Sequence, residues 1–220
     1  MFASQLTSQI IPVLHLQDSI ERALQLMQEN HVTQLPVVNK EKFLGMIDED
    51  ALLDARNETV NIASLHSDFS KVAVNESSHL FNVLKLAEET AGSIIAVIKE
   101  NGDFAGTIPL ANIVRGMADM IGVKEPGAVI VIEMDANKFS AGEINRLVET
   151  NDAVIMQMNT SIDKYTGKLF LSLKLNKPDV SDIVATFQRY DYNVTYYQGE
   201  EEYENELRTN YDNLINYLSI

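Results

Sequence analysis

Residues 17–52 are followed by a partial copy of themselves about 60 residues later, and this repeat limits the possible folds more than any other feature of the chain. In the first copy, apolar residues recur at helical spacing after Asp18 and Ser19, either of which can cap the start of a helix. These apolar residues are Ile20, Ala23, Leu24 and Met27. We therefore predict an amphipathic helix at the start of the repeated unit.

Two short apolar runs follow that helix. In the first copy they are residues 35–38 and 43–47, separated by the polar residues 39–42. The pattern predicts two antiparallel strands joined by a tight turn, with another helix beginning near Asp48. The second copy has Leu80, Leu84 and Leu86 at the positions of Ile20, Leu24 and Leu26, residues 96–98 at 36–38, and residues 104–106 at 43–45. Its turn contains Asn101-Gly102, and glycine readily supplies the positive φ that such turns need.

The duplicated helix, strand, strand, helix unit resembles the CBS domain family, most clearly in the text HVTQLPVVNKEKFLGMID of the first copy. The resemblance covers roughly residues 10–120, with one repeat at about 10–56 and the other at about 70–120. We place the predicted domain at residues 1–121. It implies a pseudo-twofold pair with two clefts. In this family such clefts often bind adenosine-containing ligands, and the pair regulates an attached or partner protein.

In the family, a segment of the form Gly-hydrophobic-hydrophobic-Ser/Thr-x-x-Asp contacts phosphate and ribose through its hydroxyl and its acid. In the first copy, Asp48 stands at the hydroxyl position and Ala51 at the position of the acid. In the second copy, whose segment begins at Gly106, Pro109 and Asn112 stand at these positions. The amide of Asn112 keeps the capacity to hydrogen-bond a ribose.

Arg115 follows Asn112 by three residues, so one helix face could present both side chains to a ribose and a phosphate. The acids around Asp48 would repel a phosphate. We therefore predict that a nucleotide uses the cleft of the second motif, with AMP, ADP, ATP or S-adenosylmethionine as candidate ligands and no required cofactor. The candidate ligand-binding residues are Pro36, Asp48, Ala96, Val97, Gly106, Ile108, Pro109, Asn112 and Arg115. The alternative is a constitutive oligomeric interaction module whose degenerate clefts bind no small ligand.

Residues 122–127 contain two glycines and a proline, which indicates a domain boundary. Beyond it, the near-continuous apolar run 128–134 predicts a central strand buried on both faces. Apolar spacing predicts the remaining elements in the order helix, strand, strand, helix, strand. The helices are marked by Ile144, Leu147 and Val148 and by Val180, Ile183, Val184 and Phe187. In the first of these strands Val154, Met156 and Met158 alternate with Ile155, Gln157 and Asn159, the second contains Leu169, Leu171, Leu173 and Leu175, and the last covers residues 193–197. The order βαββαβ over residues 127–198 predicts a ferredoxin-like sandwich, so the fold class of the chain is α/β (α+β).

This order after a CBS pair resembles the ACT domain, and the whole arrangement is similar to the acetoin-utilisation type of bacterial CBS protein. Amino-acid-binding members of the ACT family carry a Pro-Gly pair between the first strand and the first helix, whereas residues 135–142 here read DANKFSAG. We therefore interpret this domain as a dimerisation sheet that makes the chain a homodimer. Residues 200–220 predict a C-terminal amphipathic helix with Leu207, Tyr211, Leu214, Ile215 and Leu218 on one stripe.

Composition excludes several classes of function. A net charge of -15 argues against a large nucleic-acid surface, which needs Lys and Arg to neutralise phosphates. The chain has no cysteine, its four histidines lack metal-ligand spacing, and it shows no catalytic triad signature or P-loop. No segment reads as a signal peptide or a membrane span, so we expect a cytoplasmic chain. The predicted function is that of a regulatory protein rather than an enzyme, with an unknown regulated protein as its partner.

Overall fold

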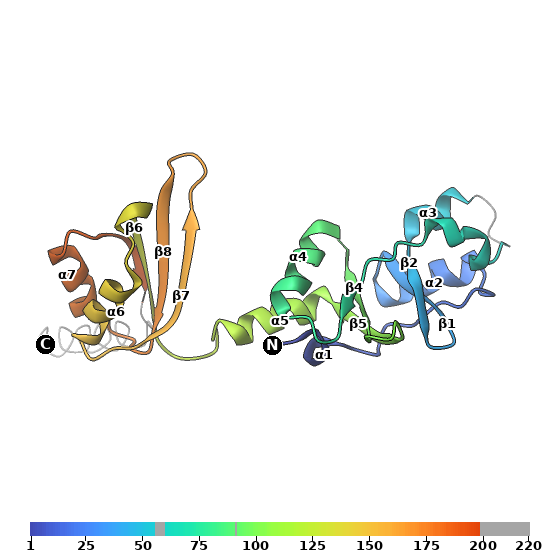
Figure 1. Cartoon of the computed structure of the whole chain (residues 1–220), viewed down its shortest axis with the longest axis horizontal. Coiled ribbons are helices and arrows are strands. Elements are labelled where there is room, and N and C mark those ends of the chain that lie inside the picture. The colour runs from blue at the N-terminus through green and yellow to red at the C-terminus, as the bar shows by residue number, and fades with distance from the viewer. Residues whose placement is uncertain (56–59, 91, 199–220) are drawn as a thin grey trace, which may run out of the picture. The chain divides into compact units, whose positions relative to one another are not determined.

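The structure, a computed structural model, describes residues 1–55, 60–90 and 92–198 (Figure 1). The chain divides into two compact units, Met1–Met120 and Ile121–Ile220. Both mix helices and strands, which confirms the predicted α/β (α+β) class. The helix predicted for residues 200–220 lies outside the described residues.

The first repeat folds in the predicted order of helix, strand, strand and helix. Its elements are α2 (Ile20–Asn30), β1 (Gln34–Asn39), β2 (Lys42–Asp48) and α3 (Glu49–Asp54). Ser19 caps α2, because its hydroxyl accepts a hydrogen bond from the amide of Arg22 at 3.1 Å. At the other end, His31 adopts the left-handed conformation and its amide closes the last turn of α2.

The second repeat has the same order. Its elements are α4 (Leu80–Thr90), β4 (Ile94–Ile98), β5 (Phe104–Pro109) and α5 (Leu110–Met120), and the short strand β3 (Val74–Asn75) runs parallel to β4. The two hairpins also share an irregularity: the pairing register shifts between Val37 and Val38 in the first and between Val97 and Ile98 in the second. The duplication predicted from the sequence is therefore present in the backbone itself.

The chain segment that precedes each repeat crosses the hairpin of the other repeat. Ser8 forms an antiparallel bridge with Thr107 on β5, and Ser70 forms the equivalent bridge with Met46 on β2. Further along, Leu14 pairs with Val37 in the first repeat, as Val74 pairs with Val97 in the second. Helix α1 (Ala3–Leu6) and the 3-10 helix η1 (Ile62–Asp68) belong to these crossing segments. The two repeats are thus interleaved and bury two adjoining hydrophobic cores.

Gly45 and Gly106 make these crossings possible. Their φ angles of 151° and 137° lie in a region that residues with a side chain rarely adopt. A Cβ atom on Gly45 would lie 2.9 Å from the carbonyl oxygen of Ser70, and one on Gly106 would lie 2.8 Å from that of Ser8. The glycine of each motif is therefore required by the close passage of the neighbouring backbone.

The second unit is the predicted ferredoxin-like sandwich. Its elements are β6 (Ala128–Asp135), η2 (Ala136–Lys138), α6 (Ala141–Glu149), β7 (Ile155–Ile162), β8 (Lys168–Leu175), α7 (Ser181–Arg189) and β9 (Asn193–Gln198). The antiparallel sheet has the order β7-β8-β6-β9, and both helices cover one of its faces (Figure 1). All the residues predicted to mark the two helices are buried in the core that they share with the sheet.

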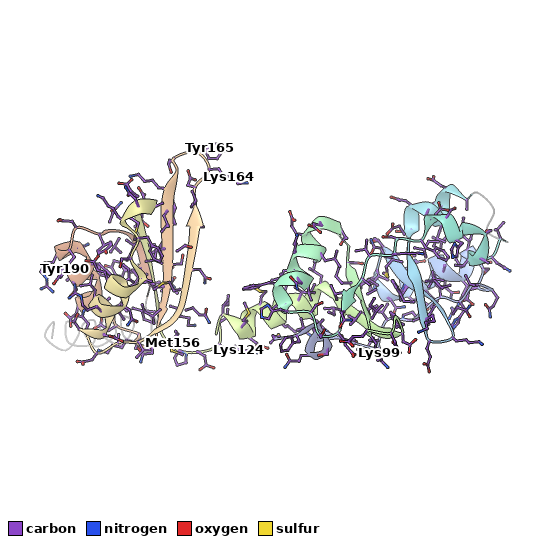
Figure 2. All side chains as sticks on the ribbon, in the orientation of Figure 1. Lys99, Lys124, Met156, Lys164, Tyr165 and Tyr190 are labelled. Atoms are coloured by element: carbon purple, nitrogen blue, oxygen red, sulfur yellow. The ribbon has the colours of Figure 1, made fainter. Side chains whose placement is uncertain are left out.

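Two expectations for this sheet were wrong. β6 is a central strand, but only alternate residues, Ala128 to Met134, are buried, whereas Val129 and Val131 are half-buried on the opposite face. The reason is that both crossover helices pack on the same side of the sheet and leave the other side open. In β7 the register shifts between Ile155 and Gln157, so Met158 packs against the core while Met156 (Figure 2) is 49% exposed. This bulge breaks the predicted alternation of Val154, Met156 and Met158.

Candidate functional site

The tips of the two hairpins in the first unit hold the repeats together. The rings of Phe43 and Phe104 stack with centroids 6.2 Å apart, and the amide of Phe104 donates to the carbonyl of Glu41 at 2.7 Å. Beside them, Nζ of Lys42 lies 2.6 Å from Oδ1 of Asp103 and donates to the carbonyl of Asn101 at 2.8 Å. These contacts hold the tips of the two hairpins, and so the two repeats, close together.

The ion pair at the hairpin tips predicts a dependence of stability on pH. The hydrogen bond from Lys42 is the main cause that lowers the pKa of Asp103 below its ordinary value. A carboxyl whose pKa is lower in the folded than in the unfolded chain stabilises the fold above the unfolded pKa, and this contribution is lost as the pH falls through the folded pKa. Lys42→Met should therefore lower the thermal midpoint at pH about 6, and the difference from the wild type should shrink toward pH about 3.

The matched control for this experiment is Lys71→Met, since Lys71 is an exposed lysine of the same unit. The difference in thermal midpoint between Lys71→Met and the wild type should stay constant over the same pH range. If the difference in thermal midpoint between Lys42→Met and the wild type were equally constant, the pair with Asp103 would add nothing to stability.

A cavity of about 180 Å³ lies between the two hairpins, and residues of both repeats line it. Its lining residues come from β1, β2, β4 and the crossing segment before the second repeat, together with the end of α4: Gln34, Met46, Asp48, Ser70, Val72, Thr90, Ile94, Ile95 and Ala96. Five of these side chains are apolar, and the other four are one carboxylate, one amide and two hydroxyls. Such a site suits a small molecule with an apolar body and a few polar groups.

Asp48 is the charged group of this cavity, which no Lys, Arg or His lines. It stands at the N-cap of α3, yet its side chain makes no capping hydrogen bond there. The carboxylate therefore gives the cavity a negative potential that disfavours phosphate and favours a neutral or cationic group.

Among the residues predicted to bind a ligand, the structure brings Asp48 and Ala96 together at this cavity, from different repeats. Pro36 is buried and pairs with Met46 on the neighbouring strand, and Pro109 pairs with Ile94. Gly106 lies beneath the backbone of Ser8. The side chains of Val97 and Ile108 are fully buried in the core of the second repeat and do not reach the cavity.

Asn112 and Arg115 lie elsewhere, on helix α5. Nδ2 of Asn112 donates to the carbonyl of Leu6 at 2.9 Å and so joins α5 to α1. Arg115 is exposed and forms no ion pair within the part of the chain that the structure describes. Sequence analysis did not identify the polar residues Gln34, Ser70 and Thr90, although Gln34 and Thr90 lie within the two repeats, because they reach the cavity only through the interleaving of the repeats.

The second motif contains a buried hydroxyl, on strand β5. Thr107 corresponds to Met46 in the first repeat, is 1% exposed, and has no hydrogen-bond partner for Oγ1 among the described residues. An unpaired buried hydroxyl costs free energy. This motif therefore carries a buried polar group without a hydrogen-bond partner among the described residues.

The family model of the CBS domain matches residues 3–58. Because the second repeat has the same order of elements, the same shift of register and an equivalent glycine, the first unit is a CBS domain pair. A search of curated protein sequences found no match.

Solved structures with similar coordinates include other CBS proteins. A CBS domain pair/ACT domain protein from Thermotoga maritima is 17% identical, with a TM-score of 0.49 over 54% of this chain and 98% of that chain. The CBS domains of a transcriptional regulator from Streptococcus pneumoniae are 17% identical, with a TM-score of 0.46 over 52% and 98%. The CBS-pair protein CBSX2 from Arabidopsis thaliana is 18% identical, with a TM-score of 0.46 over 54% and 94%.

The ACT and acetoin-utilisation resemblances, and dimerisation through the second unit, stay predictions.

The loop at which an ACT domain would bind an amino acid is held by internal ion pairs. Asp135 at the end of β6 pairs with Nζ of Lys168 at 2.6 Å and with Nζ of Lys138 at 3.9 Å. Ser140 caps α6 by accepting from the amide of Glu143. None of the described helices is long and apolar enough to cross a membrane.

Proposed function

We propose that this protein is a non-enzymatic ligand sensor whose CBS pair binds an adenosine-containing molecule in the cavity between its hairpins. The observation that carries the proposal is the cavity itself, which both repeats line and which combines five apolar with four polar side chains. A lining of this mixed polarity suits a purine ring and a ribose.

The size of the cavity suggests how binding would be transmitted. A volume of about 180 Å³ is below the roughly 300–1,000 Å³ typical of sites that enclose a whole small molecule. A complete nucleoside would therefore separate the repeats on binding, since the hairpin tips hold them close. A ligand shifts the equilibrium between a close and a separated arrangement of the repeats only by the difference between its affinities for the two. We expect the higher affinity for the separated arrangement, because its cavity is wider.

The negative charge of the cavity ranks the candidate ligands by expected affinity. Asp48 favours the sulfonium and amino groups of S-adenosylmethionine over the phosphates of AMP, ADP and ATP. We therefore expect S-adenosylmethionine to raise the thermal midpoint most and ATP least. At 100 times its dissociation constant a ligand adds about 2.7 kcal/mol, which corresponds to a shift of several degrees.

Two variants locate the site. Asp48→Asn keeps the size of the side chain but removes its charge, so it should weaken the effect of S-adenosylmethionine and strengthen that of AMP. Asp50→Asn is the matched control, because Asp50 lies two residues further on, in the first turn of α3, is exposed and does not line the cavity. A shift that Arg115→Glu abolishes and Asp48→Asn leaves intact would move the site to the second motif. No shift with any of the four compounds would overturn the sensor and favour the constitutive interaction module.

A further inference from the structure

The open face of the sheet in the second unit, which neither helix covers, carries a cluster of apolar side chains. Val131 on the central strand β6 lies at the centre of this cluster and is half-buried. Its neighbours are Val129 two positions earlier on β6, Tyr196 directly opposite on β9, and Phe170 diagonally opposite on β8. Neighbours of this kind on one face of a sheet lie close enough to form a continuous surface. We name these four residues the sheet patch.

The other surfaces of the second unit offer no comparable cluster among the described residues. The exposed side chains of α6 and α7 are short or polar, as at Asn145, Ala185 and Gln188, and none of them is large and apolar. Met156 and Ile162 are exposed, but they belong to β7, the edge strand farthest from β9. An apolar segment that continues from β9 therefore meets the sheet patch first.

The chain itself supplies such a segment. Residues 199–220 follow β9 directly, and β9 is the edge strand beside β6 in the sheet order β7-β8-β6-β9. The amphipathic helix predicted for this segment carries five apolar residues on one stripe from Leu207 to Leu218. At a rise of about 1.5 Å per residue the stripe is roughly 16 Å long, and four strands spaced about 4.8 Å apart span about 14 Å. The stripe is thus long enough to cross the whole sheet.

Charge favours the same placement. Lys174 lies on the open face at the end of the sheet where β9 ends, because it pairs with Val129 and Val129 pairs with Gln198. Its ammonium group donates to two backbone carbonyls of the segment before β6 but forms no ion pair with a described residue. The segment after β9 starts with glutamates at positions 200–202, which would therefore lie near a cation that no described acid neutralises.

We propose that residues 199–220 cover the open face of the sheet in their own molecule, with the apolar stripe on the sheet patch. Burial of the stripe against the patch removes both apolar surfaces from water, which stabilises this arrangement. Only residues 199–206 separate the end of β9 from Leu207. Because this connection is short, the local concentration of the segment is far higher at its own sheet than at the sheet of another molecule. The open face is then closed within each chain.

The absence of cysteine allows a direct test, since introduced thiols are the only ones in the chain. Full-length Ser172→Cys/Leu214→Cys chains are treated with a short bismaleimide. Ser172 is half-buried directly opposite Val131 on the open face, and cysteine is close to serine in size. We expect a crosslinked product of monomer size in which the peptides that contain residues 172 and 214 are joined.

Two matched pairs of thiols separate docking from random collisions of a tethered segment. Ala185→Cys/Leu214→Cys places the first thiol on the exposed side of α7. Ser172→Cys/Asn216→Cys places the second thiol on the side of the predicted helix opposite the stripe. Both pairs should give severalfold less crosslink than Ser172→Cys/Leu214→Cys. Equal yields from all three pairs would overturn the proposal.

Chains with a single thiol identify the molecule that covers the face, and we expect no crosslinked dimer from any of them. A dimer from Ser172→Cys alone would show that the sheet of a second copy covers the face. A dimer from a mixture of Ser172→Cys and Leu214→Cys chains would show that the segments are exchanged between molecules. Either result overturns the proposal.

The rate at which a maleimide modifies the Ser172→Cys chain gives an independent measurement of coverage. Adding Leu214→Asp and Ile215→Asp places two charges on the stripe and should increase this rate severalfold, because the charged stripe no longer packs on the sheet patch. The same additions should leave the rate of a Tyr165→Cys chain unchanged, since Tyr165 is exposed at the β7–β8 turn. A rate at residue 172 that does not respond to the two charges would exclude coverage by the segment.

Discussion

Replacing Gly127 with alanine is expected to lower the free energy of unfolding of the second unit by at least about 3 kcal/mol. A Cβ atom on this residue would overlap the carbonyl oxygen of Leu175, and its φ of 143° is strained for any residue with a side chain. The backbone of Leu175 cannot move away at low cost, because it pairs with Ala128 in the sheet.

Gly142→Ala is the matched control within the same unit. No atom lies within 4 Å of a Cβ at Gly142, which is in the first turn of α6. This change should raise stability by about 0.4–1 kcal/mol, because alanine has less freedom to lose on folding. Equal effects of the two substitutions would contradict the clash at Gly127.

Tyrosine fluorescence measures the stability of the second unit in this comparison. All eight of its tyrosines follow residue 120 and it has no tryptophan, so tyrosine fluorescence during urea unfolding reports on the second unit alone.

Phe187→Ala should destabilise the second unit by about 3–5 kcal/mol. The ring is fully buried at the centre of the core formed by both helices and the sheet, and it meets the ring of Tyr192 edge-on with centroids 5.7 Å apart. Burial, together with a hydrogen bond to Glu143, raises the pKa of Tyr192 to about 12. The substitution leaves a cavity beside the half-buried ring of Tyr192.

Tyrosine fluorescence measures this change as well, and Tyr165→Ala provides the comparison. Tyr165 lies at the β7–β8 turn (Figure 2) and is 98% exposed, so its loss should change stability by less than about 0.5 kcal/mol. A loss of similar size at both positions would mean that the core around Phe187 is not the source of stability.

The sequence predicted the elements well because the signals for them are local. Ser19 and Ser140 cap helices within three residues, Gly102 takes a positive φ in its turn, and apolar spacing marks α6 and α7. The repeat predicted the first unit for the same reason, since each copy carries the same local pattern. The exceptions depend on contacts between distant segments: the open face of β6 on which side of the sheet the helices cover, and the bulge at Met156 on the pairing of β7 with β8.

The candidate site required the tertiary structure. Asp48 and Ala96 are 48 positions apart and line one cavity only because the crossing segments interleave the repeats. Asn112 and Arg115 share a helix as expected, yet the packing of α1 on α5 gives the amide to Leu6 and leaves the arginine at the surface.

By itself, the sequence determined the duplicated CBS unit, the βαββαβ order of the second unit and the acidic character of the chain, because caps, turns and apolar spacing act over a few residues. The tertiary structure alone decided which side chains meet between the repeats and which faces stay exposed. The physical reason is that a cavity and a free helix face arise from contacts between segments far apart in the chain, and no local pattern encodes those contacts.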